Sequence, residues 1–297
     1  MAKRRTQYLV DASMYIFRAW FSMPDSMVDK DGWPVNAVYG YTAFLCQLIE
    51  NHQPEYIAAA FDESLAKCFR NEIYPDYKAN RESAPEELKR QFRLCRKVSE
   101  LMGLSCYSSK RYEADDLIGT LAHKMRKQDF RSVIVSGDKD LAQLLEGADQ
   151  LFDYAKDIRY SQKHIREKFG VKPSQMIDLL ALAGDAVDNI PGVPGVGNKT
   201  ATALLEKFSS LENLYKRLNK VETMSLRGAN RIMKLLEEHK ESAFMSQELA
   251  TIVRNAPVKA GVRILRRKTP DIEGLNRLFN KLQFGDRIRQ RINDLPV

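Results

Sequence analysis

Three aspartates of this 297-residue chain follow short apolar runs, each at a point where a buried strand is predicted to end. Asp11 comes after YLV, Asp62 after IAAAF and Asp138 after VIVSG. A single aspartate at such a position is commonly a helix cap or a turn former. Parallel strands, however, bring their carboxyl ends to one edge of a sheet, where ligands bind. We therefore expect these three carboxylates to lie together.

Further acids stand in tight groups along the chain. They are Glu113, Asp115 and Asp116, directly before an apolar helical stretch; Asp140, just past a strand end; and Asp185 with Asp188, in a loop after a predicted helix. The helix dipole favours acids in a first helical turn, but three such neighbours repel one another. A bound cation would remove that repulsion.

These nine carboxylates have no His or Cys beside them, and oxygen ligands alone favour Mg²⁺ or Mn²⁺ over zinc or copper. So many acids suggest two ions. In phosphodiester hydrolysis, two such ions lie about 4 Å apart and stabilise the attacking and leaving oxygens. The motifs therefore predict a metal-dependent enzyme that acts on phosphate esters.

Composition agrees with a polyanionic partner. The net charge is +8, the estimated pI is 9.2, and a hydrophobic fraction of 44% permits a sizeable core. The four cysteines and four histidines are dispersed, which argues against a zinc site or a disulfide framework and favours a reducing cytoplasm. No apolar run is long enough to span a bilayer. We expect a cytoplasmic, nucleoid-associated monomer with no membrane partner.

The elements that must position these acids alternate in the first half of the chain. Residues 7–10, 56–61 and 132–135 read as strands, and residues 38–50 and 117–127 read as helices between them. This alternation predicts an α/β domain with a largely parallel central sheet.

Residues 76–97 differ from this pattern. They are highly charged and poor in branched apolar residues, so they are predicted to form an exposed helical or partly mobile insertion. After Gly170 the chain is predicted to be almost wholly helical, with helices over residues 173–183 and 199–208 on either side of GDAVDNIPGVPGVGN. Further helices are expected around residues 230–239, 242–252 and 273–279.

The glycine-rich segment is close to a nucleotide-binding P-loop, since it contains Gly192, Gly195, Gly197, Lys199 and Thr200. Asn198 adds a residue before the lysine, however, and a helix rather than a strand precedes the loop. Both features argue against ATP binding and against a dinucleotide-binding fold.

The ordered set of motifs indicates a family. The motifs are LVDAS, FDESLAKCFR, YPDYKANR, YEADD, SGDKD and LAGDAVDNIPGVPGVGNKTA. From about Tyr8 to about Pro257 the chain resembles the 5′-nuclease superfamily, which includes the 5′–3′ exonuclease domain of bacterial DNA polymerase I and stand-alone bacterial and phage flap endonucleases. Because no polymerase segment follows Val297, we expect a stand-alone nuclease or one domain of a longer protein.

The resemblance implies an architecture and a metal set. Residues 1–170 would form a PIN-like α/β catalytic core, with a helical arch at about residues 76–97. Residues 171–297 would form a helical DNA-binding region, with a helix–hairpin–helix (H3TH) module at about residues 173–208. The implied ligands of two Mg²⁺ ions, with Mn²⁺ as a substitute, are Asp11, Asp62, Glu113, Asp115, Asp116, Asp138, Asp140, Asp185 and Asp188.

The resemblance also implies DNA contacts. Lys78 and Arg81 would contact the scissile phosphate as catalytic residues, and Tyr77 would stack on a base. Arg70 would bind a phosphate or hold the arch. The hairpin would bind duplex phosphates through its backbone and a potassium ion through its carbonyls, using Gly192, Val193, Gly195, Gly197, Lys199 and Thr200.

The function that follows is metal-dependent 5′–3′ exonuclease and flap endonuclease activity at or near the 5′ ends of DNA. Two alternatives stay open: a structure-specific DNA-binding protein with negligible catalysis, and a nuclease acting mainly on RNA in RNA–DNA hybrids. A smaller metal-dependent ribonuclease with a similar core is a third, and the hairpin module argues against it.

Overall fold

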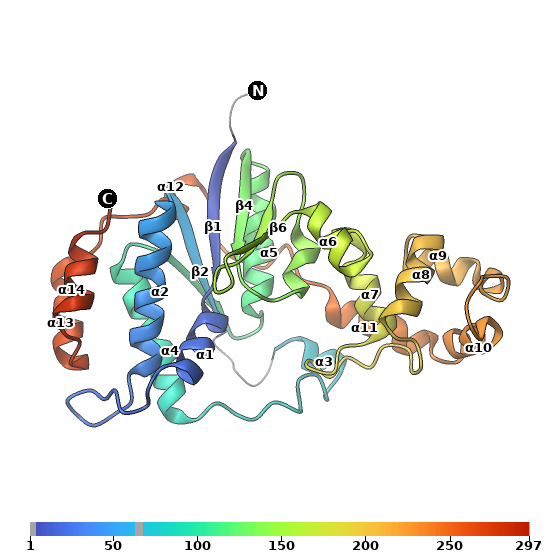
Figure 1. The fold of residues 1–297 in the computed structure, drawn as a ribbon, viewed down its shortest axis with the longest axis horizontal. Helices are drawn as coiled ribbons and strands as arrows, with labels where there is room; N and C mark the ends of the chain where they lie inside the picture. Colours follow the sequence, from blue (N-terminus) through green and yellow to red (C-terminus); the bar gives the residue numbers. More distant parts are fainter. Residues whose placement is uncertain (1–3, 63–67, 297) are drawn as a thin grey trace.

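The computed structural model describes residues 4–62 and 68–296, and residues 63–67 of the FDESLAKCFR motif lie outside this description. Its centre is a six-stranded sheet in the order β3-β2-β1-β4-β5-β6 (Figure 1). All neighbouring pairs are parallel except the edge pair of β5 and β6. The strands are β1 (Arg5–Asp11), β2 (Tyr56–Asp62), β3 (Ser105–Ser109), β4 (Phe130–Val135), β5 (Gln150–Asp153) and β6 (Ile158–Tyr160). The predicted α/β fold is confirmed.

Successive side chains of each strand point to opposite faces of the sheet, and both faces are buried. Leu9 belongs to one hydrophobic cluster and Val10 to the other. The face of Val10 is covered by α1, α2, α4, α13 and α14, and the face of Leu9 by α5. These helices are α1 (Ala12–Ser22), α2 (Asn36–His52), α4 (Glu86–Leu101), α5 (Ala114–Arg126), α13 (Ile272–Leu282) and α14 (Asp286–Asn293).

The charged segment at residues 76–97 is only partly the exposed insertion that its composition predicts. Residues 86–97 belong to α4, whose Leu88, Phe92 and Cys95 are buried against α2. The prediction was wrong for this half because one buried stripe at helical spacing is enough to hold a helix whose other faces are charged. The connection from residue 74 to residue 85 is the part that lies over the acids.

After Gly170 the chain is helical, as predicted, and its elements up to α11 extend as an arm beside the sheet (Figure 1). The predicted helix at 173–183 is a 3₁₀ turn followed by α7, and the one at 199–208 is α8. Between the sheet and the arm lie α3, η1 and α6. These elements and those of the arm are α3 (Arg70–Ile73), η1 (Asp140–Leu144), α6 (Gln162–Phe169), η2 (Pro173–Gln175), α7 (Met176–Ala183), α8 (Asn198–Phe208), α9 (Leu211–Lys216), η3 (Leu218–Val221), α10 (Ala229–Glu238) and α11 (Lys240–Ala250).

The last helices do not continue the arm. After α11 the chain returns along the sheet, and α12 (Val262–Leu265) leads to α13 and α14 on the far side of α2 (Figure 1). Phe279 and Ile292 complete the core there. This packing differs from a single helical DNA-binding region over residues 171–297. The basic ILRRK segment lies at the amino end of β2, where Arg266 pairs with Glu55, away from the acids.

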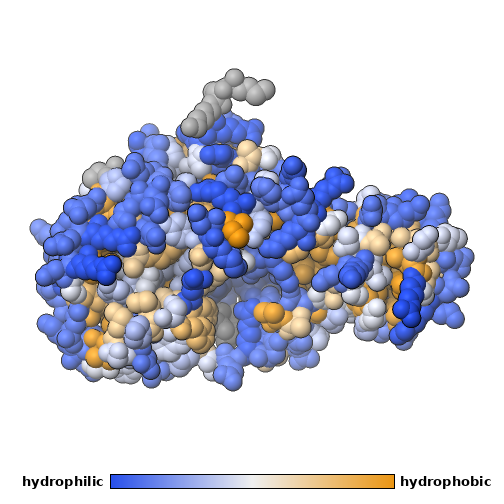
Figure 2. Space-filling model, viewed as in Figure 1, coloured by the Kyte–Doolittle hydropathy of each residue, from blue (hydrophilic) through white to orange (hydrophobic). Residues whose placement is uncertain are grey.

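The surface is largely hydrophilic, with a hollow in the middle of the face drawn in Figure 2, between the sheet and the arm. In the described part of the chain, no helix is both long and apolar enough to cross a membrane.

Candidate active site

Asp11 and Asp62 end the neighbouring strands β1 and β2, so their carboxylates lie at the same edge of the sheet. Asp11 caps α1: its Oδ1 accepts a hydrogen bond from the amide of Met14 at 3.1 Å, and its Oδ2 accepts one from Ser136 Oγ at 2.8 Å. Asp62 Oδ1 accepts one from the amide of Ala114 at 2.8 Å, at the start of α5. Asp138 lies close enough for its charge to raise the pKa of Asp11, so the three strand-end acids gather here, with α5 joined to them.

Burial and mutual repulsion raise the pKa of the carboxyls in this group. Burial contributes most to raising the pKa of Asp11 to about 7, and the charge of Asp62 adds to it. Burial, followed by Asp138 and Asp11, holds the pKa of Asp115 well above its usual range. The pKa of Asp62 is also raised, by burial and then by Glu113. Such carboxyls favour a cation among them, because it would offset the repulsion.

A second group of acids lies on two facing loops. Asp138 Oδ1 accepts a hydrogen bond from the amide of Asp140 at 2.8 Å, where η1 begins. Burial, and then Asp138, raises the pKa of Asp140 to about 7. Asp185 lies nearby and accepts a hydrogen bond from Lys139 Nζ at 2.6 Å. Asp140 Oδ1 is buried without a hydrogen-bond partner, and such an oxygen is suited to binding a cation.

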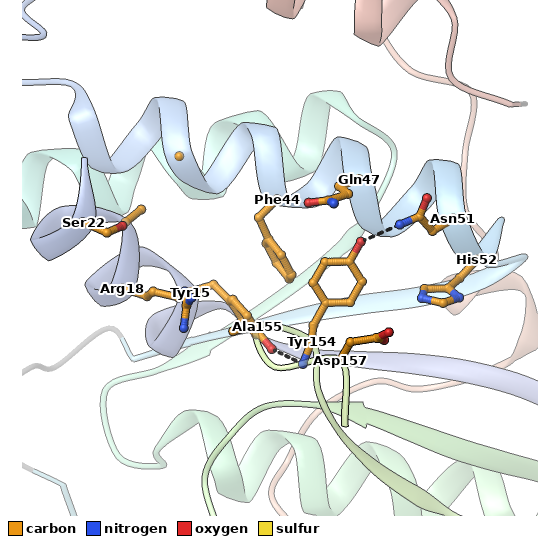
Figure 3. A pocket seen from close by; sticks show the side chains of 12 residues that line it. Tyr15, Arg18, Ser22, Phe44, Gln47, Asn51, His52, Tyr154, Ala155 and Asp157 are labelled. Atoms are coloured by element: carbon orange, nitrogen blue, oxygen red, sulfur yellow. Dashed lines mark hydrogen bonds between the residues drawn. The ribbon is translucent and has the colours of Figure 1, made fainter. Parts of the chain in front are cut away.

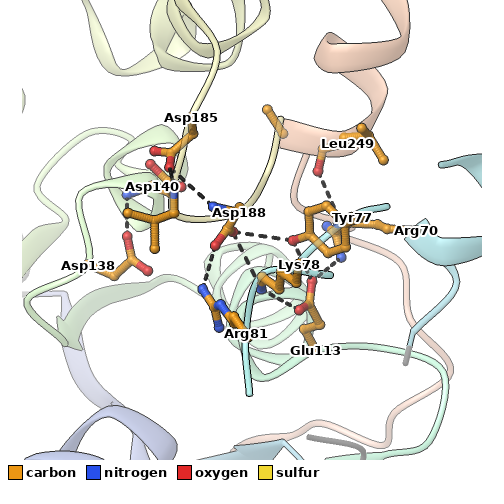
Figure 4. A network of polar contacts seen from close by, with 12 residues as sticks. Arg70, Tyr77, Lys78, Arg81, Glu113, Asp138, Asp140, Asp185, Asp188 and Leu249 are labelled. Carbon is orange, nitrogen blue, oxygen red and sulfur yellow. Dashed lines mark hydrogen bonds and ion pairs between the residues drawn. The ribbon is translucent and has the colours of Figure 1, made fainter. Parts of the chain in front are cut away.

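Two basic residues of one loop lie between the acid groups (Figure 4). Lys78 Nζ is 2.5 Å from Glu113 Oε1 and 3.5 Å from Asp188 Oδ2, and Arg81 forms an ion pair with Asp188 Oδ1. Burial by itself would lower the pKa of Lys78, but Glu113 and Asp188 outweigh burial and raise it. Lys78 is therefore a charged ammonium that compensates two carboxylates.

The loop that carries these residues is docked onto the loop of Asp185 and Asp188. The Lys78 amide donates to the Asp188 carbonyl at 3.0 Å, and Asn80 Nδ2 donates to the Ala186 carbonyl at 2.9 Å. Lys78 has a φ of 56°, which is uncommon for a residue other than glycine. This backbone conformation accompanies the placement of the Lys78 side chain among the acids.

In the part of the chain that the structure describes, no three His, Cys, Asp or Glu side chains are arranged to hold one metal ion. Lys78 and Arg81 take up the charge of Glu113 and Asp188 instead. The donor atoms nevertheless suit hard divalent cations, because they are carboxylate oxygens. Burial and neighbouring acids raise the pKa of Asp11 and Asp140, and a bound cation would offset both effects.

Asp116 does not fit the predicted role of a metal ligand. It is fully buried, and Arg70 donates to both of its carboxylate oxygens, at 2.8 and 2.9 Å. Its oxygens also accept hydrogen bonds from the amides of Val253 and Glu113, at 2.8 and 3.0 Å. Each of its two oxygens thus already accepts two hydrogen bonds from protein groups. The structure therefore corrects the assignment of Asp116 to the metal set.

Two of the predicted DNA contacts, Arg70 and Tyr77, are buried in this structure. Arg70 is 2% exposed, and its guanidinium donates only to protein groups, so it is neither a solvated side chain nor free to bind a phosphate. Tyr77 is 4% exposed, with its hydroxyl 3.1 Å from Glu113 Oε2 and 3.4 Å from Asp188 Oδ2. A ring buried in this way cannot stack on a base without movement of the loop.

The glycine hairpin joins α7 to α8. Gly192 has a φ of 62°, and a Cβ there would lie 2.3 Å from the Gly184 nitrogen, so only glycine fits. The side chain of Val193 is buried and its amide donates to the Leu182 carbonyl at 2.9 Å, and its contact with DNA stays a prediction. Gly197 and Lys199 are exposed where α8 begins, and no side chain caps this end of the helix. The first amides of α8 are therefore oriented to bind an anion.

Comparison with known protein families covers both halves of the chain. The family model described as 5′-3′ exonuclease, N-terminal resolvase-like domain, matches residues 6–170. The model described as 5′-3′ exonuclease, C-terminal SAM fold, matches residues 171–273. The chain belongs to the 5′-3′ exonuclease family. Its predicted resemblance to 5′-nucleases is confirmed, and with it the prediction of a nuclease, an enzyme that hydrolyses phosphodiester bonds.

The relatives that this chain matches include proteins about three times its length and proteins of about its own length. DNA polymerase I of Bacillus subtilis is 38% identical over 289 residues, which are 96% of this chain and 32% of the relative. The chain thus spans about a third of the length of the polymerases it matches. A 5′-3′ exonuclease of Buchnera aphidicola is 34% identical over 285 residues, 96% of this chain and 99% of the relative.

Solved structures show the same fold. A T5 5′-exonuclease with bound zinc ions has a TM-score of 0.66 at 20% identity, and the match covers 98% of this chain and 99% of that one. A T5 flap endonuclease in a complex with DNA and metal ions has the same score, identity and coverage.

A cavity of about 540 Å³ lies apart from the acids. Tyr15, Phe44, Gln47, Asn51 and Tyr154 line it, between α1, α2 and the turn that joins β5 to β6 (Figure 3). The rings of Tyr15 and Phe44 stack at 3.9 Å between centroids. None of the predicted metal ligands lines this cavity, so it does not mark the reaction centre.

Two serines that hydrogen-bond among these acids were missed by the sequence reasoning. Ser13 Oγ accepts a hydrogen bond from the Asp62 amide at 2.9 Å, which joins β2 to α1. Ser136 Oγ donates to Asp11 and accepts from the amide of Asp138 at 3.1 Å. Both lie inside the quoted motifs LVDAS and SGDKD, and their positions beside the acids were the available signal.

Proposed function

We propose that this chain hydrolyses phosphodiester bonds of DNA at or near 5′ ends, including 5′ flaps, with two divalent cations. The observation that carries this proposal is the carboxyl edge of the sheet, where Lys78 and Arg81 pair with Glu113 and Asp188 close to other acids of raised pKa, together with an exposed helix start in the arm. Acids suit cations, and the basic pair and the helix start suit phosphates.

The acids that would hold the ions form two sets. Asp11, Asp62, Glu113 and Asp115 form the first, and Asp138, Asp140, Asp185 and Asp188 the second. Bound Mg²⁺ or Mn²⁺ would lower the pKa of a bound water and offset charge on the leaving oxygen. The T5 proteins with bound metal ions and DNA share this fold, which supports the proposal.

The chain's own residues position the substrate. Lys78 and Arg81 would leave Glu113 and Asp188 for the scissile phosphate, where their charge stabilises the transition state. Tyr77 would be exposed by the same movement and would then be able to stack on a base. The connection over residues 74–85 would border the path of the single strand.

The hairpin would hold the duplex without reading its sequence. Backbone amides at Gly197 and Lys199, and the side chains of Lys199 and Thr200, would bind phosphates of one strand. Gly195 is exposed beside them and allows close approach of a backbone. A potassium ion bound by hairpin carbonyls is part of this proposal.

The experiment uses a duplex with a labelled 5′ flap, incubated with the protein and Mg²⁺, Mn²⁺ or EDTA. A short labelled product that forms near the junction only with metal is expected. Tight duplex binding without cleavage under either metal would instead identify a non-catalytic DNA-binding protein. A parallel RNA–DNA substrate, cut faster than DNA, would reassign the substrate to the hybrid.

A further inference from the structure

We propose that Arg70 and Gln143 are positioning residues that hold both acid groups at a fixed offset from the DNA-binding hairpin, and thereby set where the strand is cut. This inference rests on the proposed function, because it concerns the position of the same cleavage. Its basis is that the start of α5 and η1, which carry acids of the two groups, are both joined by hydrogen bonds to residues 249–253, at and just after the end of α11.

Arg70 connects α5 to this stretch. Its Nε donates to the Leu249 carbonyl and its Nη2 to the Thr251 carbonyl, both at 2.8 Å. Its other contacts, at 2.8 to 2.9 Å, are with Glu113 and both oxygens of Asp116. A guanidinium has five N–H donors, and these contacts use every one inside the protein. The first turn of α5, with Glu113, is thus fixed to the end of α11.

Gln143 makes the matching connection from η1, the turn that begins at Asp140. Its Nε2 donates to the Ala250 carbonyl at 2.9 Å, and its Oε1 accepts from the Ile252 amide at 3.0 Å. Gln143 is buried, so these bonds do not compete with water. The second acid group therefore has its own attachment to the same short stretch.

The other part of α11 holds the hairpin. Ser246 Oγ accepts a hydrogen bond from the Gly192 amide at 2.9 Å, and Ser242 Oγ donates to the Gly192 carbonyl at 2.7 Å. Ser246 and Leu249 are three residues apart on one helix, about 4.5 Å along its axis. A single rigid helix thus connects the phosphate-binding hairpin to both acid groups.

A fixed offset between the duplex and the acids would place one phosphate at the reaction centre. Loosening either attachment would let the acids meet neighbouring phosphates as well. Misplacement by about 1 Å can cost about 10²-fold in rate, so turnover would fall while duplex affinity stayed the same.

The test compares Arg70→Lys, Gln143→Met and the wild type on the labelled flap duplex, with product positions mapped to the nucleotide. Arg70→Lys keeps the charge but cannot reach all the partners, and Gln143→Met keeps the size but removes both bonds. Arg291→Lys is the matched control, because Arg291 makes a two-bond pair with Glu50 on the other side of the sheet. Duplex affinity in Ca²⁺ and hydrogen exchange of residues 249–253 are measured in parallel.

We expect one dominant product from the wild type and from Arg291→Lys. For each of the other two variants we expect products spread by a nucleotide or more, faster exchange at residues 249–253 and unchanged duplex affinity. A single product at the wild-type position in both variants, despite faster exchange, would overturn the inference. The absence of any metal-dependent product from the wild type would refute the proposed function instead. If Arg70→Lys does not fold, Gln143→Met decides the question.

Discussion

The ammonium of Lys78 lies 2.5 Å from the carboxylate of Glu113, in the middle of the acids that would bind metal. The same ammonium is 3.5 Å from Asp188, on the other acid group. Lys78 thus offsets the charge of both groups, and a divalent cation would compete with it for the same oxygens. This relationship determines how the site should respond to substitution, metal and pH.

Lys78→Ala should tighten divalent binding and slow cleavage. Removing the ammonium frees Glu113 and Asp188 to bind a cation, but it also removes charge from the scissile phosphate, at a cost of about 10²-fold or more in kcat. Calorimetric titration with Ca²⁺ measures the first effect, and single-turnover cleavage with Mg²⁺ the second. Lys78→Arg, which keeps the charge, is the control. Weaker Ca²⁺ binding by the alanine variant would show that Lys78 does not compete with metal.

Added metal should stabilise the fold more at pH 8 than at pH 6. Asp11 titrates near 3.8 when unfolded and near 7 in the fold, so between these values the folded state holds a proton that the unfolded state has lost. Its contribution therefore lowers the free energy of unfolding as pH rises through this window. Asp140 behaves in the same way. At pH 8 both carboxylates are charged in the fold and repel their neighbours, so a cation binds them without displacing a proton and relieves more repulsion than at pH 6. Thermal melts with Mg²⁺ and with EDTA at both pH values measure the difference, and equal shifts at the two values would contradict it.

Two aspartate substitutions should separate metal binding from stability. Asp138→Asn should abolish cleavage with little loss of stability, because Asp138 is exposed and its charge repels Asp140. Asp116→Asn should cost about 3–5 kcal/mol of stability, because it leaves the buried Arg70 without its main partner. Urea unfolding and flap cleavage are measured for both variants. Full stability of Asp116→Asn with a loss of metal affinity would restore Asp116 to the metal set.

Two glycines of the hairpin should respond differently to alanine. Gly192→Ala should lower both stability and duplex affinity, because its Cβ would meet the Gly184 backbone at 2.3 Å. Gly197→Ala should leave stability unchanged, since its φ is −90° and a Cβ there meets nothing within 4 Å. If a phosphate approaches the backbone at Gly197, the added methyl group would obstruct it, and Gly197→Ala should then lower duplex affinity without changing stability. Thermal melts and fluorescence anisotropy with a labelled duplex measure the two properties, and unchanged affinity in both variants would refute duplex binding by the hairpin.

The sequence by itself determined the fold class and the group of acids. Apolar runs that each end at Asp11, Asp62 or Asp138 give a parallel sheet with acids at one edge, because strand periodicity and parallel pairing leave little choice of geometry. The glycine hairpin between two helices was readable for a similar reason, since positive φ at Gly192 and Gly195 restricts those positions largely to glycine.

Only the tertiary structure decided which charges are paired and which are left for a ligand. Asp115 and Asp116 are adjacent in sequence, but Asp116 turns into the protein toward Arg70, whereas Asp115 lies close enough to Asp11 and Asp138 for their charges to raise its pKa. The partners of Arg70 at Leu249 and Thr251 are about 180 residues away along the chain, so no local pattern indicates them. The same holds for α4, whose charged sequence hides a buried stripe that packs on α2. Long-range packing determines burial, and burial determines which of several similar carboxylates remains available to a cation.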